Sequence, residues 1–182
     1  GAISQVLVTT RPERVGALVL TSCDYRDNFP PKPFSYIKLG GLPGGVWALA
    51  QSLRIKPLRR TPIAFGWLSK SPIDPRAENS YLGPVMKSAG VRRDTRSFIR
   101  GVDRQVTNEA ADLLGNFDRP ALIAWSGDDR LFPADDARSL AQDLPKCRLE
   151  FIDDAYTFSM EDNPEDLAAL IRDFLKVAEV AS

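Results

Sequence analysis

The last third of the sequence alternates between strand patterns and helix patterns. Residues 121–125 (ALIAW) and 148–152 (RLEFI) have the apolar content of strands in a sheet. Apolar residues with helical spacing follow each of them, and Asn163 and Pro164 suit the cap and first residue of the last helix. Strand, helix, strand and helix form the βαβ pattern, so we predict an α/β fold with a parallel sheet. The apolar helix positions are Ala137, Leu140, Ala141 and Leu144, then Leu167, Leu170, Ile171, Phe174 and Leu175.

The same kind of pattern occurs at the start of the chain. Residues 17–20 (ALVL) are apolar at every position, which is typical of a strand buried on both faces of a parallel sheet. Before them, Ile3, Val6 and Leu7 have helical spacing. We therefore predict a first helix and a third strand that joins the sheet.

Between residues 25 and 115 the sequence consists of short amphipathic stretches. They are interrupted by segments that contain Pro or Gly, such as NFPPKP, LGGLPGG and RRTP. We predict an insertion of small helices and turns at residues 25–115, and a core made of residues 1–24 and 116–182. Residues 46–53 have helical spacing after a Pro-Gly-Gly turn, and Thr107 is suited to cap a later helix.

The composition excludes several kinds of partner and site. The 24 basic and 24 acidic side chains balance, which argues against a nucleic-acid partner. No apolar run approaches the roughly 20 residues that span a bilayer, so we expect no membrane partner. The chain has no histidine, which removes Ser-His-Asp, Cys-His and histidine-zinc sites. Cys23 and Cys147 lack the spacing of a metal knuckle, so we expect no metal, no cofactor and a cytoplasmic location.

Carboxylates follow two of the predicted strands. Residues 126–133 (SGDDRLFP) come after the strand at 121–125, and ligands of open α/β sheets bind at the carboxyl ends of strands. Asp129 is therefore a candidate catalytic or binding group; the alternative is that it forms a turn and caps the next helix. Asp24 follows the first strand and is an alternative acid, or else a turn or capping residue. Cys23 beside it is interpreted as an ordinary buried residue.

Five arginines give the insertion a run of positive charge. Asp94 and Asp103 lie among them, so we interpret the run as a solvated face and not as an anion site. The five are Arg92, Arg93, Arg96, Arg100 and Arg104.

Four stretches together resemble the α/β-hydrolase fold family. Residues 1–5 (GAISQ) resemble the start of the helix after the nucleophile elbow, G-x-Nu-x-G-G, and residues 11–20 resemble the end of that helix and the next strand. Residues 121–133 resemble the strand and loop that present the acid. Residues 149–165 resemble the last strand and the histidine loop, usually D-A-G-H-F and then P-E. The resemblance covers nearly the whole chain and implies a partial α/β-hydrolase fold, with parallel strands, flanking helices and a helical cap formed by residues 25–115.

The resemblance also assigns positions in the site. Asp129 stands at the position of the acid and Thr157 at that of the histidine, with Tyr156 in place of the preceding Gly. A threonine hydroxyl stays neutral and does not accept a proton as imidazole does, so the implied catalytic triad is degenerate. The nucleophile position would lie about three residues before Gly1.

Two functions of different classes follow. The first is hydrolysis of a small apolar ester or epoxide-like substrate by a longer product that supplies the nucleophile, with Asp129 orienting a base other than histidine. The second is non-catalytic binding of a small apolar molecule in a pocket lined by Tyr156, Trp47 and Trp67, although such aromatics also occur as plain core. A truncated gene product is a third interpretation. Its first strand would have a bare edge, through which we expect association, for example as a homodimer.

Overall fold

Three parallel strands form the sheet of the computed structural model, which describes residues 1–180. They are β1 (Leu18–Thr21), β2 (Ala121–Ser126) and β3 (Cys147–Ile152), in the order β1-β2-β3. Leu18 pairs with Ala121, which pairs in turn with Cys147. The α/β prediction is confirmed, and each predicted strand occurs with its ends shifted by no more than one residue.

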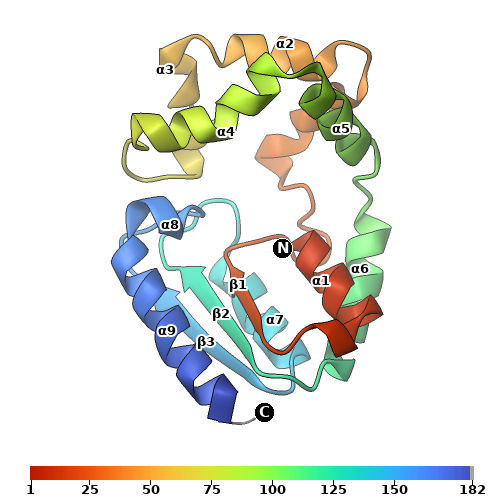
Figure 1. The fold of residues 1–182 in the computed structure, drawn as a ribbon, viewed down its shortest axis with the longest axis vertical. Coiled ribbons are helices and arrows are strands. Elements are labelled where there is room, and N and C mark those ends of the chain that lie inside the picture. Colours follow the sequence, from red (N-terminus) through yellow and green to blue (C-terminus); the bar gives the residue numbers. More distant parts are fainter. Residues whose placement is uncertain (181–182) are drawn as a thin grey trace.

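Helices account for most of the remaining structure (Figure 1). Within residues 1–180 none of them is both long and apolar enough to span a bilayer. Short 3-10 segments occur at Pro12–Arg14, Lys32–Gly41, Phe65–Trp67 and Leu114–Asn116. The α-helices are α1 (Ala2–Thr10), α2 (Gly45–Ser52), α3 (Lys56–Arg59), α4 (Pro75–Lys87), α5 (Ala89–Arg100), α6 (Arg104–Leu113), α7 (Ala134–Asp143), α8 (Ser159–Asp162) and α9 (Pro164–Val180).

The central strand β2 separates two apolar clusters. All six of its residues are buried, and its side chains alternate between the two faces of the sheet, as the pleat requires. Ala121, Ile123 and Trp125 pack with residues of α1 and α7, whereas Leu122 and Ala124 pack with residues of α9. Cover on both faces explains why the sequence of β2 is apolar at nearly every position.

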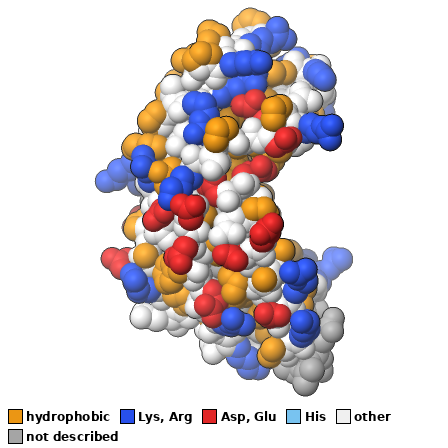
Figure 2. Space-filling view, turned by 90° about the vertical axis from the view of Figure 1, so that its left-hand side faces the viewer, with side chains coloured by type: hydrophobic (Ala, Val, Ile, Leu, Met, Phe, Trp, Pro, Cys, Tyr) orange, Lys and Arg blue, Asp and Glu red, His pale blue; other side chains and the backbone are white. Residues whose placement is uncertain are grey.

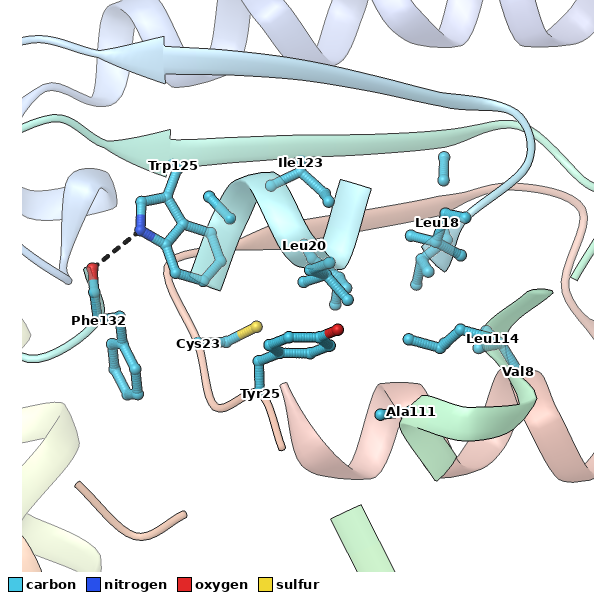
Figure 3. Close-up of a cluster of buried hydrophobic side chains, with 14 of the residues drawn as sticks. Val8, Leu18, Leu20, Cys23, Tyr25, Ala111, Leu114, Ile123, Trp125 and Phe132 are labelled. Carbon is cyan, nitrogen blue, oxygen red and sulfur yellow. Dashed lines mark hydrogen bonds between the residues drawn. The ribbon is translucent and has the colours of Figure 1, made fainter. Parts of the chain in front are cut away.

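Trp125 links the end of β2 to the loop that follows it. Its side chain is fully buried in the larger cluster, and its indole Nε1 donates a hydrogen bond to the carbonyl oxygen of Phe132 at 3.0 Å (Figure 3). The two rings meet edge to face with their centroids 6.4 Å apart. The loop between β2 and α7 is therefore fastened to the core at its far end.

Helix α6 begins earlier than the sequence predicts. Asp103 caps it by accepting a hydrogen bond from the backbone N–H of Gln105 at 2.9 Å. The prediction of Thr107 as the cap is wrong, because Thr107 lies inside the helix and is buried. Its hydroxyl donates instead to the backbone oxygens of Arg26 and Arg104.

Helices α2 to α5 gather beyond the carboxyl ends of the strands, above the sheet in Figure 1. We call these four the insertion helices. Figure 2 shows the molecule hollowed at mid-height between them and the sheet. Helix α6, by contrast, packs against α1 beside the sheet. The division into a core of residues 1–24 and 116–182 and an insertion of residues 25–115 stays a prediction.

Candidate functional site

Asp129 lies in the loop that follows β2, at the carboxyl end of the sheet. Its Oδ1 accepts hydrogen bonds from the backbone N–H groups of Leu131 at 2.8 Å and Phe132 at 3.0 Å. This is a turn held by an aspartate side chain, one of the two roles that the sequence left open. The turn fixes the carboxylate in one orientation.

Thr157 meets Asp129 from the loop after β3. The Thr157 hydroxyl is buried and donates a hydrogen bond to Asp129 Oδ1 at 3.0 Å, across 28 positions of sequence. Adjacent parallel strands end at the same edge of the sheet, which brings the two loops together. The positions of acid and histidine that the resemblance assigns are therefore in direct contact.

The surroundings of Asp129 favour its protonated form. Burial raises the pKa of the carboxyl above its ordinary value of 3.8, while the backbone N–H groups of Phe132 and Leu131 and the hydroxyls of Ser22 and Thr157 oppose the rise. Oδ2 is buried and accepts no hydrogen bond from the part of the chain that the structure describes. Asp129 is thus a better proton acceptor than an exposed aspartate.

This raised pKa predicts a pH-dependent stability. The folded protein binds a proton at Asp129 more tightly than the unfolded chain, so the contribution of this group is greatest below 3.8 and is lost as the pH rises through the raised pKa. Asp129→Asn removes that loss. We expect the free energy of unfolding of the variant, relative to wild type, to increase as the pH rises from about 4 to neutrality. Urea unfolding across this range tests it; a flat or falling difference would contradict it.

Asp24, the alternative acid, binds the start of α1. Its carboxylate accepts a hydrogen bond from the backbone N–H of Ala2 at 3.0 Å, and its carbonyl oxygen accepts one from the side chain of Gln5 at 2.6 Å. Cys23 is buried, and burial raises the pKa of its thiol to about 12, so it is no nucleophile at neutral pH. A Cβ atom at Gly1 would lie 2.5 Å from the Cβ of Cys23, which shows how closely α1 begins beside the end of β1.

Tyr156 is buried next to Thr157 and stacks against positive charge. The guanidinium of Arg130 lies 4.7 Å from the ring centroid and the Lys70 ammonium 6.0 Å from it. These are cation–π contacts, which favour the electron-rich ring face. The Tyr156 ring thus contacts Lys70 and Arg130, and Arg130 follows Asp129 directly in the sequence.

Asp162 joins the insertion to the loop that carries Thr157, and we call its contacts the Asp162 clamp. Its carboxylate accepts hydrogen bonds from Ser69 Oγ at 2.9 Å and from the backbone N–H groups of Lys70 at 2.8 Å, Ser71 at 3.0 Å and Tyr156 at 3.0 Å. Because Ser69, Lys70 and Ser71 lie more than 90 positions away in the sequence, no local pattern identifies Asp162 as a positioning residue.

Lys70 is a second contact that the sequence does not predict. Its ammonium donates to Asp128 Oδ2 at 2.7 Å and to Asp154 Oδ1 at 2.5 Å. Both carboxylates raise its pKa above the ordinary value for lysine. One side chain of the insertion thus bridges the loops after β2 and β3.

The two tryptophans predicted to line a pocket lie in different places. Trp67 packs against the larger core cluster, whereas Trp47 is 55% exposed and lines a small cavity with arginines of α5. A different aromatic group lies next to Thr157, where the Phe158 ring is 6.4 Å from Phe65 and 5.9 Å from Tyr81. Trp47 is therefore not part of the surroundings of Asp129.

A cavity of about 760 Å³ opens beside Asp129. Its lining is mixed in charge and includes several side chains that carry hydrogen-bond donors. Among the described residues, no group of three or more His, Cys, Asp or Glu side chains could hold a metal ion. The lining includes Tyr25, Asn28, Lys32, Arg104, Asp129 and Arg130.

A model of the α/β-hydrolase fold family matches residues 95–164, a range that contains both Asp129 and Thr157. A search of curated proteins found no significant match. Solved structures are similar over nearly the whole chain, and the chain spans about three fifths of the length of those described next.

Three of these structures illustrate the likeness. An α/β-hydrolase enzyme from a Medee basin deep-sea metagenome library, MGS-M2, is 18% identical, with a TM-score of 0.65 over 96% of this chain and 61% of its own. The serine hydrolase CCSP0084 from Cycloclasticus zankles is 14% identical, with a TM-score of 0.67 over 96% and 60%. The 2-hydroxy-6-oxo-6-phenylhexa-2,4-dienoate hydrolase of Rhodococcus sp. strain RHA1 is 15% identical, with a TM-score of 0.69 over 96% and 60%. Together with the family match, they show that the chain has the α/β-hydrolase fold.

Proposed function

We propose that this chain is the C-terminal part of a hydrolase that acts on a small apolar ester or epoxide-like substrate. The observation that carries the proposal is the hydrogen bond from Thr157 to Asp129 at the carboxyl end of the sheet. The names of the similar structures, which include a serine hydrolase and a dienoate hydrolase, support hydrolysis as the reaction class. The nucleophile is supplied by residues that precede Gly1 in a longer product.

In this proposal Asp129 is the base, and it acts through Thr157. The Thr157 hydroxyl already donates its hydrogen to Asp129, so its oxygen lone pairs are left to accept a hydrogen bond from the nucleophile. As the nucleophile bonds to an ester carbonyl carbon, its proton passes to Thr157 Oγ1 and the threonine proton passes to Asp129. The proton then returns through Thr157 to the leaving alkoxide, which departs as the alcohol and leaves the acyl group on the nucleophile. Water, deprotonated through the same two residues, then attacks this acyl group and releases the acid and the free nucleophile. The raised pKa of Asp129 favours this transfer.

The insertion acts as the cap of this site. The Asp162 clamp and the two ion pairs of Lys70 hold its segment 68–71 against the loops that carry Asp129 and Thr157. In addition, the backbone N–H of Phe158 donates to the carbonyl oxygen of Leu68 at 2.7 Å. A cap fixed in this way excludes water from the reacting groups.

Hydrolysis of short p-nitrophenyl esters by the longer product tests the role of Asp129. We expect Asp129→Asn and Thr157→Val each to lower kcat/KM by about 100-fold, the lower end for loss of a general base. Thr157→Ser keeps a hydroxyl and should retain most of the activity. Asp135→Asn, an exposed carboxylate on α7, is the matched control and should leave kcat/KM unchanged. Unchanged activity in Asp129→Asn would overturn the proposal.

Non-catalytic binding is the second candidate function, and Thr157 favours it. A neutral hydroxyl in place of histidine suits a site that has kept its shape and lost its base. If the longer product hydrolyses no ester yet binds small apolar molecules with an affinity that Asp129→Asn changes, the binding function replaces the hydrolytic one.

A further inference from the structure

A second cavity lies among the insertion helices, apart from Asp129. It has a volume of about 290 Å³ and is lined by residues of α2, α5 and the segment before α2; the two helices lie in the upper part of Figure 1. No acidic side chain of the described residues lines it. Four arginines do, which gives this small space four positive charges. The lining consists of Leu42, Gly44, Val46, Trp47, Ala89, Arg92, Arg93, Arg96, Ser97 and Arg100.

Helix geometry gathers the arginines on one face. Arg92, Arg96 and Arg100 are spaced by four residues along α5, and Arg93 lies beside them. Like charges at this spacing destabilise a helix. From the sequence we interpret this run as a solvated face broken by acids, and the exposed pair of Arg93 and Asp94 fits that interpretation. Arg92 and Arg96, however, are partly buried, and neither Asp94 nor Asp103 lines the cavity.

Uncharged partners hold two of these arginines in place. Arg92 Nη1 donates to the carbonyl oxygens of Val85 at 3.0 Å and Met86 at 3.1 Å, and Arg96 Nε donates to that of Gly41 at 3.0 Å. Backbone carbonyls orient a guanidinium and leave its charge uncompensated. The cavity therefore contains fixed positive charge.

The other two arginines are available to a ligand. Arg93 pairs with Asp94 at 3.2 Å, but both side chains are more than 70% exposed, so water screens the pair. For Arg100 the structure gives no ion pair within residues 1–180. Gly44, Val46 and Trp47 at the start of α2 also line the cavity, and the positive end of a helix favours negative charge. The N–H of Gly45 itself donates to the carbonyl oxygen of Leu42 at 3.0 Å.

We infer that this cavity binds the phosphate or diphosphate group of a small ligand or of a lipid headgroup. Planar guanidinium groups bind phosphate oxygens in pairs, and four of them around one space suit an anion with more than one charge. A volume of about 290 Å³ is large enough to hold such a group. Trp47 lies on the wall of the cavity and remains half exposed.

Calorimetric titration with sodium pyrophosphate at constant ionic strength tests the inference. We expect saturable binding to the chain, weakened about tenfold or more by the double variant Arg93→Gln/Arg100→Gln. Arg92 and Arg96 are not substituted, because their side chains donate hydrogen bonds to backbone carbonyl oxygens. The control is Arg138→Gln/Arg148→Gln, which removes the same charge from exposed ion pairs on α7 and β3 and should bind as wild type does. Absence of saturable binding, or equal weakening in both double variants, would overturn the inference.

Vesicle flotation separates the two sources of the phosphate group. Vesicles of phosphatidylcholine with phosphatidic acid are compared with vesicles of phosphatidylcholine alone. Capture by the acidic vesicles that pyrophosphate displaces supports a lipid headgroup, whereas pyrophosphate binding without capture supports a soluble phosphate ester. Capture that pyrophosphate leaves unchanged, with no calorimetric binding, contradicts a site in this cavity. None of these measurements depends on ester hydrolysis.

Discussion

Replacing Trp125 by alanine is expected to lower the free energy of unfolding by about 3–5 kcal/mol. Trp125 is fully buried, and its removal leaves a cavity between β2 and the loop before α7. It also removes the donor to the carbonyl oxygen of Phe132, a hydrogen bond worth about 1 kcal/mol. Urea unfolding followed by far-ultraviolet circular dichroism measures the change.

The chain offers a matched control of the same residue type. Trp47→Ala removes a side chain that is 55% exposed, and we expect a change within about 0.5 kcal/mol. Trp125→Phe keeps an aromatic ring and should lower the free energy of unfolding clearly less than Trp125→Ala does. This variant can still be measured if the alanine variant does not fold. Equal effects of Trp125→Ala and Trp47→Ala would contradict the packing described for β2.

Replacing Asp162 by alanine is expected to lower the free energy of unfolding by about 2–4 kcal/mol. The change leaves the backbone N–H groups of Lys70, Ser71 and Tyr156 without their acceptor, and hydrogen bonds to a charged group are the stronger kind. Ser69, which is fully buried, loses one acceptor as well. Urea unfolding measures the loss of stability.

Hydrogen exchange shows whether that loss comes from the clamp. The amides of Lys70, Ser71 and Tyr156 should exchange faster in Asp162→Ala than in wild type. Asp173→Ala is the control, because Asp173 is exposed and pairs only weakly with Lys176, at 3.4 Å. Unchanged exchange at the three amides, together with a full loss of stability, would contradict the role given to Asp162.

Much of the core could be predicted from the sequence because apolar residues there recur at the spacing of a helix or form the apolar run of a buried strand. The strand at 121–126 is apolar at every position but Ser126 because both its faces are covered, and α9 begins at Pro164 behind its cap, with Asn163 Oδ1 accepting from Asp166 N–H at 3.3 Å. Thr107 shows the limit of such reasoning. It has the right residue type for a cap, but Asp103 fills that role, and a contact with Arg26 far away in sequence uses the Thr107 hydroxyl.

Some residues of the candidate site could be predicted from the sequence, and others could not. Asp129 and Thr157 could be located because a resemblance assigns positions one by one, and parallel strands bring their ends together. Lys70 and Asp162 could not be predicted, since the contacts between residues 69–71 and the loops after β2 and β3 span 58 to 93 positions and depend on how the segment before α4 folds back on the sheet. The surroundings of Trp47 could not be predicted either, because helical spacing does not say which neighbour a side chain faces.

The Asp162 clamp also couples the movement of residues 68–71 to that of the loop after β3. Residues 68–71 lie between α3 and α4 and residues 156–158 in the loop after β3, yet their backbones share hydrogen bonds through Asp162 and between Phe158 and Leu68. A swing of the insertion away from the sheet must break these bonds or carry Thr157 away from Asp129. A ligand in the cavity beside Asp129 that prefers the closed form therefore also stabilises the Asp129–Thr157 contact, to the extent that the clamp stays intact, so occupancy of this cavity and order of the site are linked equilibria.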